Sequence, residues 1–109
     1  MRPVDVPEID VDELRRRREQ GAVLLDVRQP DEYESGHVPG ARLIPLPEVP
    51  DRLAEVPAGE TVLVICKTGG RSRRAAEYLR ANGVDAVNVA GGTMAWIEAG
   101  HPVDAGGTS

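Results

Sequence analysis

The stretch Thr61-Val-Leu-Val-Ile-Cys66-Lys-Thr-Gly-Gly-Arg71-Ser72 joins an apolar run to a short glycine-containing loop, and it decides the fold. The five β-branched and leucine residues before Cys66 predict a strand that is buried on both faces, as in a parallel sheet. Residues 73–83 are rich in helix formers and end at a glycine, and Ser72 is the expected N-cap. We therefore expect a strand, a tight loop and a helix, with Cys66 at the sheet edge where open α/β folds bind ligands.

Cys66 is the candidate nucleophile of this loop. Successive backbone N–H groups in a glycine-containing turn, together with a helix N-terminus, form a concavity that binds anions. Lys67 and Arg71 add positive charge, and such a setting lowers a thiol pKa from about 8.5 toward the physiological range. The alternative is that Cys66 is a small buried hydrophobe that fills the core, as many free cysteines do.

The rest of the chain alternates between strand and helix patterns, which predicts a parallel-rich α/β sheet of five strands. Strands are expected at residues 4–9, 22–27, 41–46, 61–65 and 85–89. Helices are expected at residues 10–21, 30–34, 47–53, 73–83 and, after a glycine turn, 93–98. Because no shift in composition and no repeat divides the chain, we expect one domain.

Four stretches of the chain together resemble the rhodanese family of sulfurtransferases. The loop at residues 66–72 resembles the family's active-site loop, residues 25–33 and 36–41 resemble its two N-terminal signatures, and residues 89–96 resemble its C-terminal one. The resemblance extends from about residue 10 to residue 103. It implies a rhodanese-like α/β domain over residues 1–103, with a central parallel five-stranded sheet flanked by helices on both faces. Residues 104–109 are polar and glycine-rich, and we expect them to be a disordered tail.

The resemblance also implies a reaction. The Cys66 thiolate attacks the sulfane sulfur of a donor such as thiosulfate or a persulfide, and a thiol, cyanide or an acceptor protein then removes sulfur from the resulting Cys66 persulfide. Substrate-binding positions carried over from the family are Lys67, Thr68, Gly69, Gly70, Arg71 and Ser72. The related cysteine phosphatases have a longer loop, so the shorter one here favours sulfur over phosphate. Two alternatives stay open: a sulfur-relay or persulfide-binding module that serves one protein partner, and a phosphatase or arsenate reductase, which the loop length disfavours.

Asp26 and Arg28 are the expected structural supports of the site. Asp26 ends the second predicted strand, where a buried carboxylate is costly unless it is paired, and Arg28 or a loop amide is its natural partner. The resemblance suggests that both residues brace the rim of the active site, which we favour over a direct role in catalysis.

Three further basic side chains have a structural and a functional interpretation. His37 is expected to be a hydrogen-bonded turn residue rather than a base for Cys66, because loop amides stabilise a thiolate without a base. Arg73 and Arg74 oppose the dipole of the helix that they begin. Either they draw anionic donors toward Cys66 or they are a solvated pair.

The composition narrows the class of protein. The chain of 109 residues is long enough for one core, and its net charge of −5 argues against nucleic-acid binding. The one cysteine excludes an internal disulfide, a redox pair and a cysteine zinc cluster, so we expect no metal and no other cofactor. It also means that a second molecule must accept the sulfur. No window is apolar enough for a signal peptide or a membrane span, so we expect a cytoplasmic protein that does not bind membranes. The sequence does not determine the oligomeric state, and a monomer is the default expectation.

Overall fold

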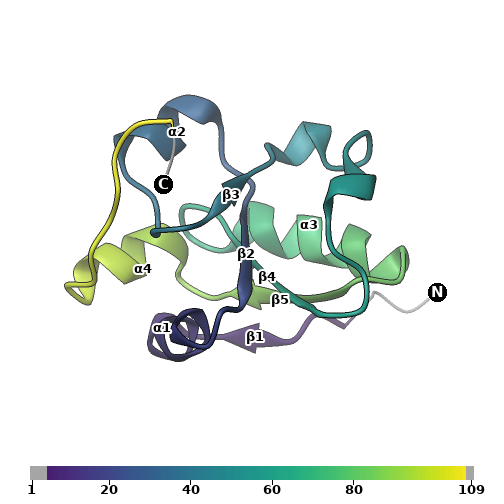
Figure 1. Cartoon of the computed structure of the whole chain (residues 1–109), viewed down its shortest axis with the longest axis horizontal. Helices are drawn as coiled ribbons and strands as arrows, with labels where there is room; N and C mark the ends of the chain where they lie inside the picture. Colours follow the sequence, from purple (N-terminus) through teal and green to yellow (C-terminus); the bar gives the residue numbers. More distant parts are fainter. Residues whose placement is uncertain (1–4, 108–109) are drawn as a thin grey trace.

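The central strand β4 (Thr61–Ile65) has the position that its apolar sequence predicts. Its side chains from Val62 onward are fully buried, and it lies between β2 and β5, with which it pairs in parallel. The computed structural model describes residues 5–107, in which the sheet order is β1-β5-β4-β2-β3 with every pairing parallel (Figure 1). The other strands are β1 (Glu8–Ile9), β2 (Val23–Asp26), β3 (Arg42–Leu43) and β5 (Asp85–Val89). The expected five-stranded parallel sheet is confirmed.

Helices cover both faces of the sheet, because alternate strand residues point to opposite sides. The helices are α1 (Val11–Glu19), α2 (Pro30–Ser35), α3 (Gly70–Ala81), α4 (Gly92–Glu98) and the 3₁₀ helices η1 (Leu46–Glu48) and η2 (Leu53–Glu55). Val62 and Val64 pack in a core cluster with α3 and the two 3₁₀ helices. Leu63 and Ile65 pack in a second cluster with α1, α4 and a tyrosine of α2. Figure 1 shows α1 and α4 on one side of the strands and α3 on the other.

The segment between β3 and β4 differs from the expected strand and helix. The predicted strand at 41–46 is reduced to Arg42–Leu43. The N–H groups of Ile44 and Leu46 still donate, at 2.9 and 3.0 Å, to the carbonyls of Asp26 at the end of β2 and of Val27 after it. Pro45 has no N–H between them. The predicted helix at 47–53 is replaced by the two 3₁₀ turns, because prolines at positions 47 and 50 cannot donate the bonds of a continuous α-helix.

The structure also bears on the first predicted strand and on the predicted C-terminal tail. The predicted first strand begins at Val4, which lies outside the described residues, and the observed β1 is only two residues long. The disorder expected of residues 104–109 stays a prediction, and part of this segment makes backbone hydrogen bonds. The backbone of Asp104 exchanges two hydrogen bonds of 2.9 Å with His37, and the N–H of Gly106 donates to Glu34. Residues 108 and 109 lie outside the described range.

Within residues 5–107, no helix combines the length and the apolar character that crossing a membrane requires.

Candidate active site

Cys66 follows β4 directly, at the carboxyl edge of the sheet. The backbone N–H of Gly69 donates to its sulfur at 3.1 Å, and the Ser72 hydroxyl lies 3.3 Å from the same atom. The cysteine is only 1% exposed, so its sulfur forms the floor of the loop. Hydrogen-bond donors therefore converge on a buried sulfur, which distinguishes Cys66 from a cysteine that only fills the core.

The helix begins earlier than its sequence suggests. Gly69 is the N-cap of α3, with a φ of +114° that favours glycine, and Ser72 lies inside the first turn. The expected capping role of Ser72 is therefore wrong. Its hydroxyl instead donates to Oδ1 of Asn88 at 2.6 Å and contacts Cys66, and all three side chains are buried.

The pKa of the Cys66 thiol is lowered by hydrogen bonds. Burial by itself raises this pKa, because it disfavours the thiolate. The Ser72 hydroxyl and the backbone N–H groups of Ser72, Gly69 and Thr68 outweigh burial and bring the pKa below its ordinary value. These hydrogen bonds are the leading causes of the lowered pKa, and the expected contribution of Lys67 and Arg71 stays a prediction.

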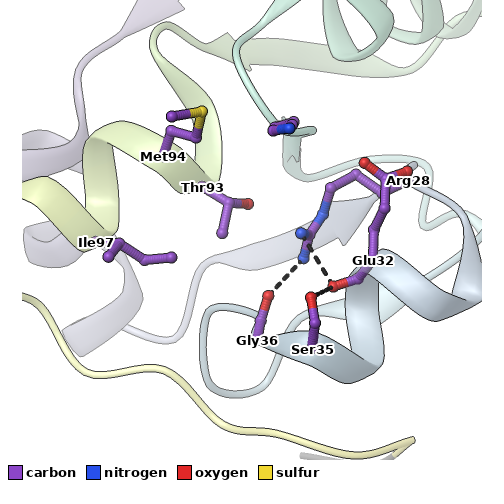
Figure 2. Close-up of a pocket in the computed structure, with 8 residues that line it drawn as sticks. Arg28, Glu32, Ser35, Gly36, Thr93, Met94 and Ile97 are labelled. Carbon is purple, nitrogen blue, oxygen red and sulfur yellow. Dashed lines mark hydrogen bonds between the residues drawn. The ribbon is translucent and has the colours of Figure 1, made fainter.

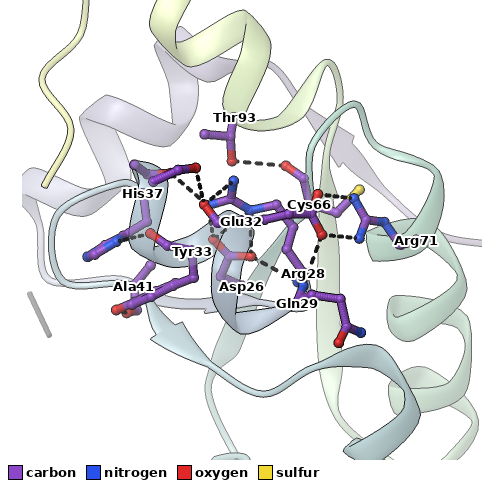
Figure 3. A network of polar contacts seen from close by, with 12 residues as sticks. Asp26, Arg28, Gln29, Glu32, Tyr33, His37, Ala41, Cys66, Arg71 and Thr93 are labelled. Atoms are coloured by element: carbon purple, nitrogen blue, oxygen red, sulfur yellow. Dashed lines mark hydrogen bonds and ion pairs between the residues drawn. The ribbon is translucent and has the colours of Figure 1, made fainter. Parts of the chain in front are cut away.

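Arg71 is held by Glu32, which projects from α2 (Figure 3). Two hydrogen bonds of 2.7 and 2.9 Å join the guanidinium to the two carboxylate oxygens. The Arg71 hydrogen bond is the main reason why the pKa of Glu32 falls to about 2. Attraction to Glu32 and, more weakly, to Cys66 raises the pKa of Arg71. The charge of Arg71 therefore acts on both Cys66 and the Glu32 carboxylate of the same chain. The sequence analysis did not identify Glu32 as this partner.

The carboxylate of Asp26 and the guanidinium of Arg28 form a buried pair behind this loop, as expected from the sequence. Asp26 is fully buried and Arg28 is 4% exposed. The Nε and Nη2 atoms of Arg28 donate to the carboxylate at 3.0 and 2.8 Å. Arg28 also donates to the carbonyls of Glu32 within α2 and of Gly36, the C-cap of α2, which joins the end of β2 to this helix. Asp26 lies opposite Ile65 in the sheet, and Ile65 is the residue that precedes Cys66 along the chain.

The N-terminus of α4 fixes the back of the loop. The N–H and hydroxyl of Thr93 donate to the carbonyl of Cys66 at 2.9 and 3.0 Å, and the N–H of Met94 donates to the carbonyl of Lys67 at 3.0 Å. These contacts turn loop carbonyls toward α4. The loop N–H groups are left facing the sulfur.

Gly92 allows this close approach, and replacing it by alanine is expected to displace the loop. A Cβ at position 92 would lie 2.5 and 2.6 Å from the carbonyl oxygens of Lys67 and Cys66, at a φ of +60°. We expect Gly92→Ala to lower the free energy of unfolding by on the order of 2–4 kcal/mol, measured by urea denaturation. Gly83→Ala is the matched control, because its φ is +85° and nothing lies near its Cβ position. Equal losses in both variants would contradict the role of the close approach.

A groove of about 220 Å³ lies beside the loop, between α2 and α4 (Figure 2). Its α4 side is partly apolar, since Met94 and Ile97 are 43% and 51% exposed. Its lining residues are Arg28, Glu32, Ser35, Gly36, Lys67, Thr93, Met94 and Ile97. The groove can hold the part of a substrate that extends away from the reacting sulfur.

His37 and Arg73 have structural contacts. His37 is buried, its Nδ1 lies 2.7 Å from the carbonyl oxygen of Tyr33, and the two rings stack with centroids 3.6 Å apart. These contacts fit the expected turn residue. The guanidinium of Arg73 lies 3.5 Å from the carboxylate of Glu8, which offsets its charge near the start of α3. A steering role for Arg73 and Arg74 stays a prediction.

Among residues 5–107, no three histidine, cysteine, aspartate or glutamate side chains are grouped closely enough to hold a metal ion.

Comparison with known proteins agrees with this geometry. The family model described as "Rhodanese-like domain" matches residues 10–99. A sulfurtransferase from Allochromatium vinosum is 36% identical over 90% of this chain and 94% of its own length. The thiosulfate sulfurtransferase GlpE from Pseudomonas syringae is also 36% identical, over 81% of this chain and 84% of its own.

Solved structures share the fold. The crystal structure of a rhodanese-related protein from Thermoplasma volcanium gives a TM-score of 0.84 at 33% identity, covering 90% of this chain and 97% of that one. Several curated relatives are longer proteins, of which this chain spans between 34% and 60%. The family match extends over most of the chain and includes the loop built around Cys66. This chain therefore belongs to the rhodanese-like domain family.

Proposed function

We propose that this chain is a sulfurtransferase that moves sulfane sulfur from a donor such as thiosulfate to a thiophilic acceptor, either cyanide or a thiol, through a Cys66 persulfide. The observation that supports this proposal best is the convergence of N–H groups and a hydroxyl on the Cys66 sulfur, which lowers its pKa. A thiolate is the reactive form of cysteine, so a lowered pKa increases the nucleophile present at neutral pH. Sulfurtransferases among the relatives agree with this chemistry.

The reaction has two covalent steps. The Cys66 thiolate attacks the outer sulfur of thiosulfate, the bond between the two sulfur atoms breaks, and sulfite leaves with the electron pair. The acceptor then attacks the outer sulfur of the persulfide, and the Cys66 thiolate leaves. Loop N–H groups stabilise the sulfur anion in both resting and leaving states. We propose a monomer as the default state of a small domain. We also propose the cytoplasm as its location, because a single free cysteine is kept reduced there.

The loop and the groove divide the binding of substrate between them in this proposal. Four residues separate Cys66 from Arg71, which gives a ring of N–H groups that suits a single sulfur atom. Exposed Lys67 lies on the groove beside this ring and offers positive charge to a sulfite group. The partly apolar groove then accommodates the rest of a thiol acceptor.

The test is the mass of the intact protein after incubation with thiosulfate and with a small-molecule persulfide. We expect a gain of one sulfur atom, its loss on addition of cyanide or a thiol, and ping-pong kinetics. Absence of that gain with every donor would refute the proposal. If the sulfur is gained but leaves only in the presence of cell extract, the alternative function as a relay for a protein acceptor is favoured, because the chain has no second thiol.

Replacing Glu32 by glutamine is expected to make Cys66 prefer anionic reagents. In the native protein Glu32 neutralises much of the Arg71 charge, and with a pKa of about 2 it stays ionised throughout the neutral range. Glutamine keeps the acceptor for the N–H of Gln29 and releases the charge of Arg71. We expect the ratio of Cys66 alkylation rates by iodoacetate and iodoacetamide to rise roughly twofold to fivefold.

Glu34→Gln is the matched control, because Glu34 is exposed on the same helix and its replacement changes the net charge equally. The same increase in both variants would show that net charge, and not release of Arg71, sets the ratio. We expect kcat/KM for thiosulfate to rise in Glu32→Gln alone.

A further inference from the structure

The Ser72 hydroxyl has two partners and one proton. Its oxygen lies 2.6 Å from Oδ1 of Asn88 and 3.3 Å from Sγ of Cys66. A hydroxyl donates one hydrogen bond and accepts through its lone pairs. Ser72 therefore cannot donate to Asn88 and to a Cys66 thiolate at the same time.

The orientation of the Asn88 amide is fixed by its other contacts. Its Nδ2 atom donates to the Glu8 carboxylate at 2.7 Å and to the Gly69 carbonyl at 3.2 Å, and both of these groups only accept. Oδ1 must therefore face Ser72, and it can only accept. Asn88 is 1% exposed and lies opposite Val64 of β4, so this oxygen has little access to water.

These contacts suit the thiol form of Cys66. The S–H group donates to the Ser72 oxygen, the Ser72 hydroxyl donates to Asn88, and each group has its partner. When the thiol loses its proton to a base in solution, the hydroxyl must turn toward the sulfur anion to stabilise it. Asn88 Oδ1 then loses its donor inside the protein, which costs free energy.

We propose that Asn88 is a positioning residue that limits the acidity of Cys66, because it competes with the thiolate for the single proton of the Ser72 hydroxyl. The loop N–H groups stabilise the thiolate in any case. Ser72 adds its contribution only when its hydroxyl leaves Asn88. The inference concerns the protonation of Cys66, so it holds whether or not the proposed sulfur transfer is correct.

Asn88 is uncharged, so its removal acts through this hydrogen bond. Charged groups reach the neighbourhood of Cys66 from the loop and from four helices or strands. These groups are Lys67 in the loop, Arg71 in α3, Glu32 on α2, Asp26 and Arg28 at the end of β2, and Glu8 on β1, which contacts Asn88. None of these groups is altered in the variants below. A shift in the Cys66 pKa can therefore be assigned to the hydroxyl.

The test is a double-mutant cycle of Asn88→Ala and Ser72→Ala, with the Cys66 pKa measured from the ultraviolet absorbance of the thiolate and from the pH dependence of alkylation by iodoacetamide. One cysteine in the chain makes both signals specific. We expect Asn88→Ala to lower the pKa by about 0.5 to 1, the range of one exchanged hydrogen bond. Ser72→Ala is expected to raise the pKa. In the Ser72→Ala background, Asn88→Ala is expected to have no effect.

Asn88→Leu removes the acceptor but keeps a bulky side chain, and it is expected to lower the pKa as Asn88→Ala does. This second variant separates loss of the acceptor from a cavity. A raised pKa in both Asn88 variants would overturn the inference and would assign Asn88 to bracing the Gly69 carbonyl. An equal decrease with and without the Ser72 hydroxyl would also overturn it.

Discussion

Replacing Cys66 by serine is expected to abolish the gain of sulfur from thiosulfate completely. Serine differs by one atom and fits the same loop, where the N–H of Gly69 can donate to its oxygen as it now donates to sulfur. The hydroxyl does not ionise at neutral pH, so the nucleophile of the first step is lost although the loop remains. The measurement is the intact mass after incubation, together with the rate at which sulfite is released.

The amino-acid composition provides the control for this prediction. Because Cys66 is the single cysteine, no other thiol of the chain can carry the sulfur. We expect Cys66→Ser to stay folded, since its side chain keeps hydrogen-bond partners in a site that is 1% exposed. Sulfite release by the folded variant at the native rate would show that the reaction does not pass through Cys66.

Local patterns predicted the elements that hold Cys66. The apolar run at 61–65 gave β4 at its observed bounds, and the pattern at 85–89 gave β5. Both strands have neighbours on each side in a parallel sheet, and the continuous apolar sequence of β4 has few other structures to adopt. Boundaries were less accurate where prolines interrupt the backbone hydrogen bonds, as between β3 and β4.

Contacts between distant residues could not be predicted from these patterns. Ser72 has the residue type of an N-cap, but its hydroxyl partner Asn88 is sixteen positions away, and Gly69 caps the helix instead. Arg71 was interpreted as a source of positive charge in the loop, and its carboxylate partner, 39 positions away on α2, was not predicted. One signal was visible: Asn88 is a polar residue in a strand that is otherwise apolar after Asp85, and such a residue needs a partner.

The second large effect is expected for the substitution Asp26→Asn, which should lower the free energy of unfolding by about 3–5 kcal/mol. The variant keeps the shape of the side chain but removes the carboxylate with which Arg28, a cation that is 4% exposed, is paired. Urea denaturation, followed by the fluorescence of buried Trp96, measures the loss. Glu19→Gln is the control, because its pair with Arg15 is exposed and 3.7 Å long, and little change is expected there.

Variants of Asp26 and Arg28 also test whether this pair only supports the site or takes part in the reaction. The Arg28 guanidinium holds carbonyls of Glu32 and Gly36 as well as Asp26, so loss of the pair releases α2 and the rim of the groove together. If Asp26 and Arg28 act only as supports, the folded fraction of Asp26→Asn should still gain sulfur on Cys66, and the double variant Asp26→Leu/Arg28→Met should recover much of the stability. Complete loss of sulfur gain in protein shown to be folded would instead place the pair in the reaction.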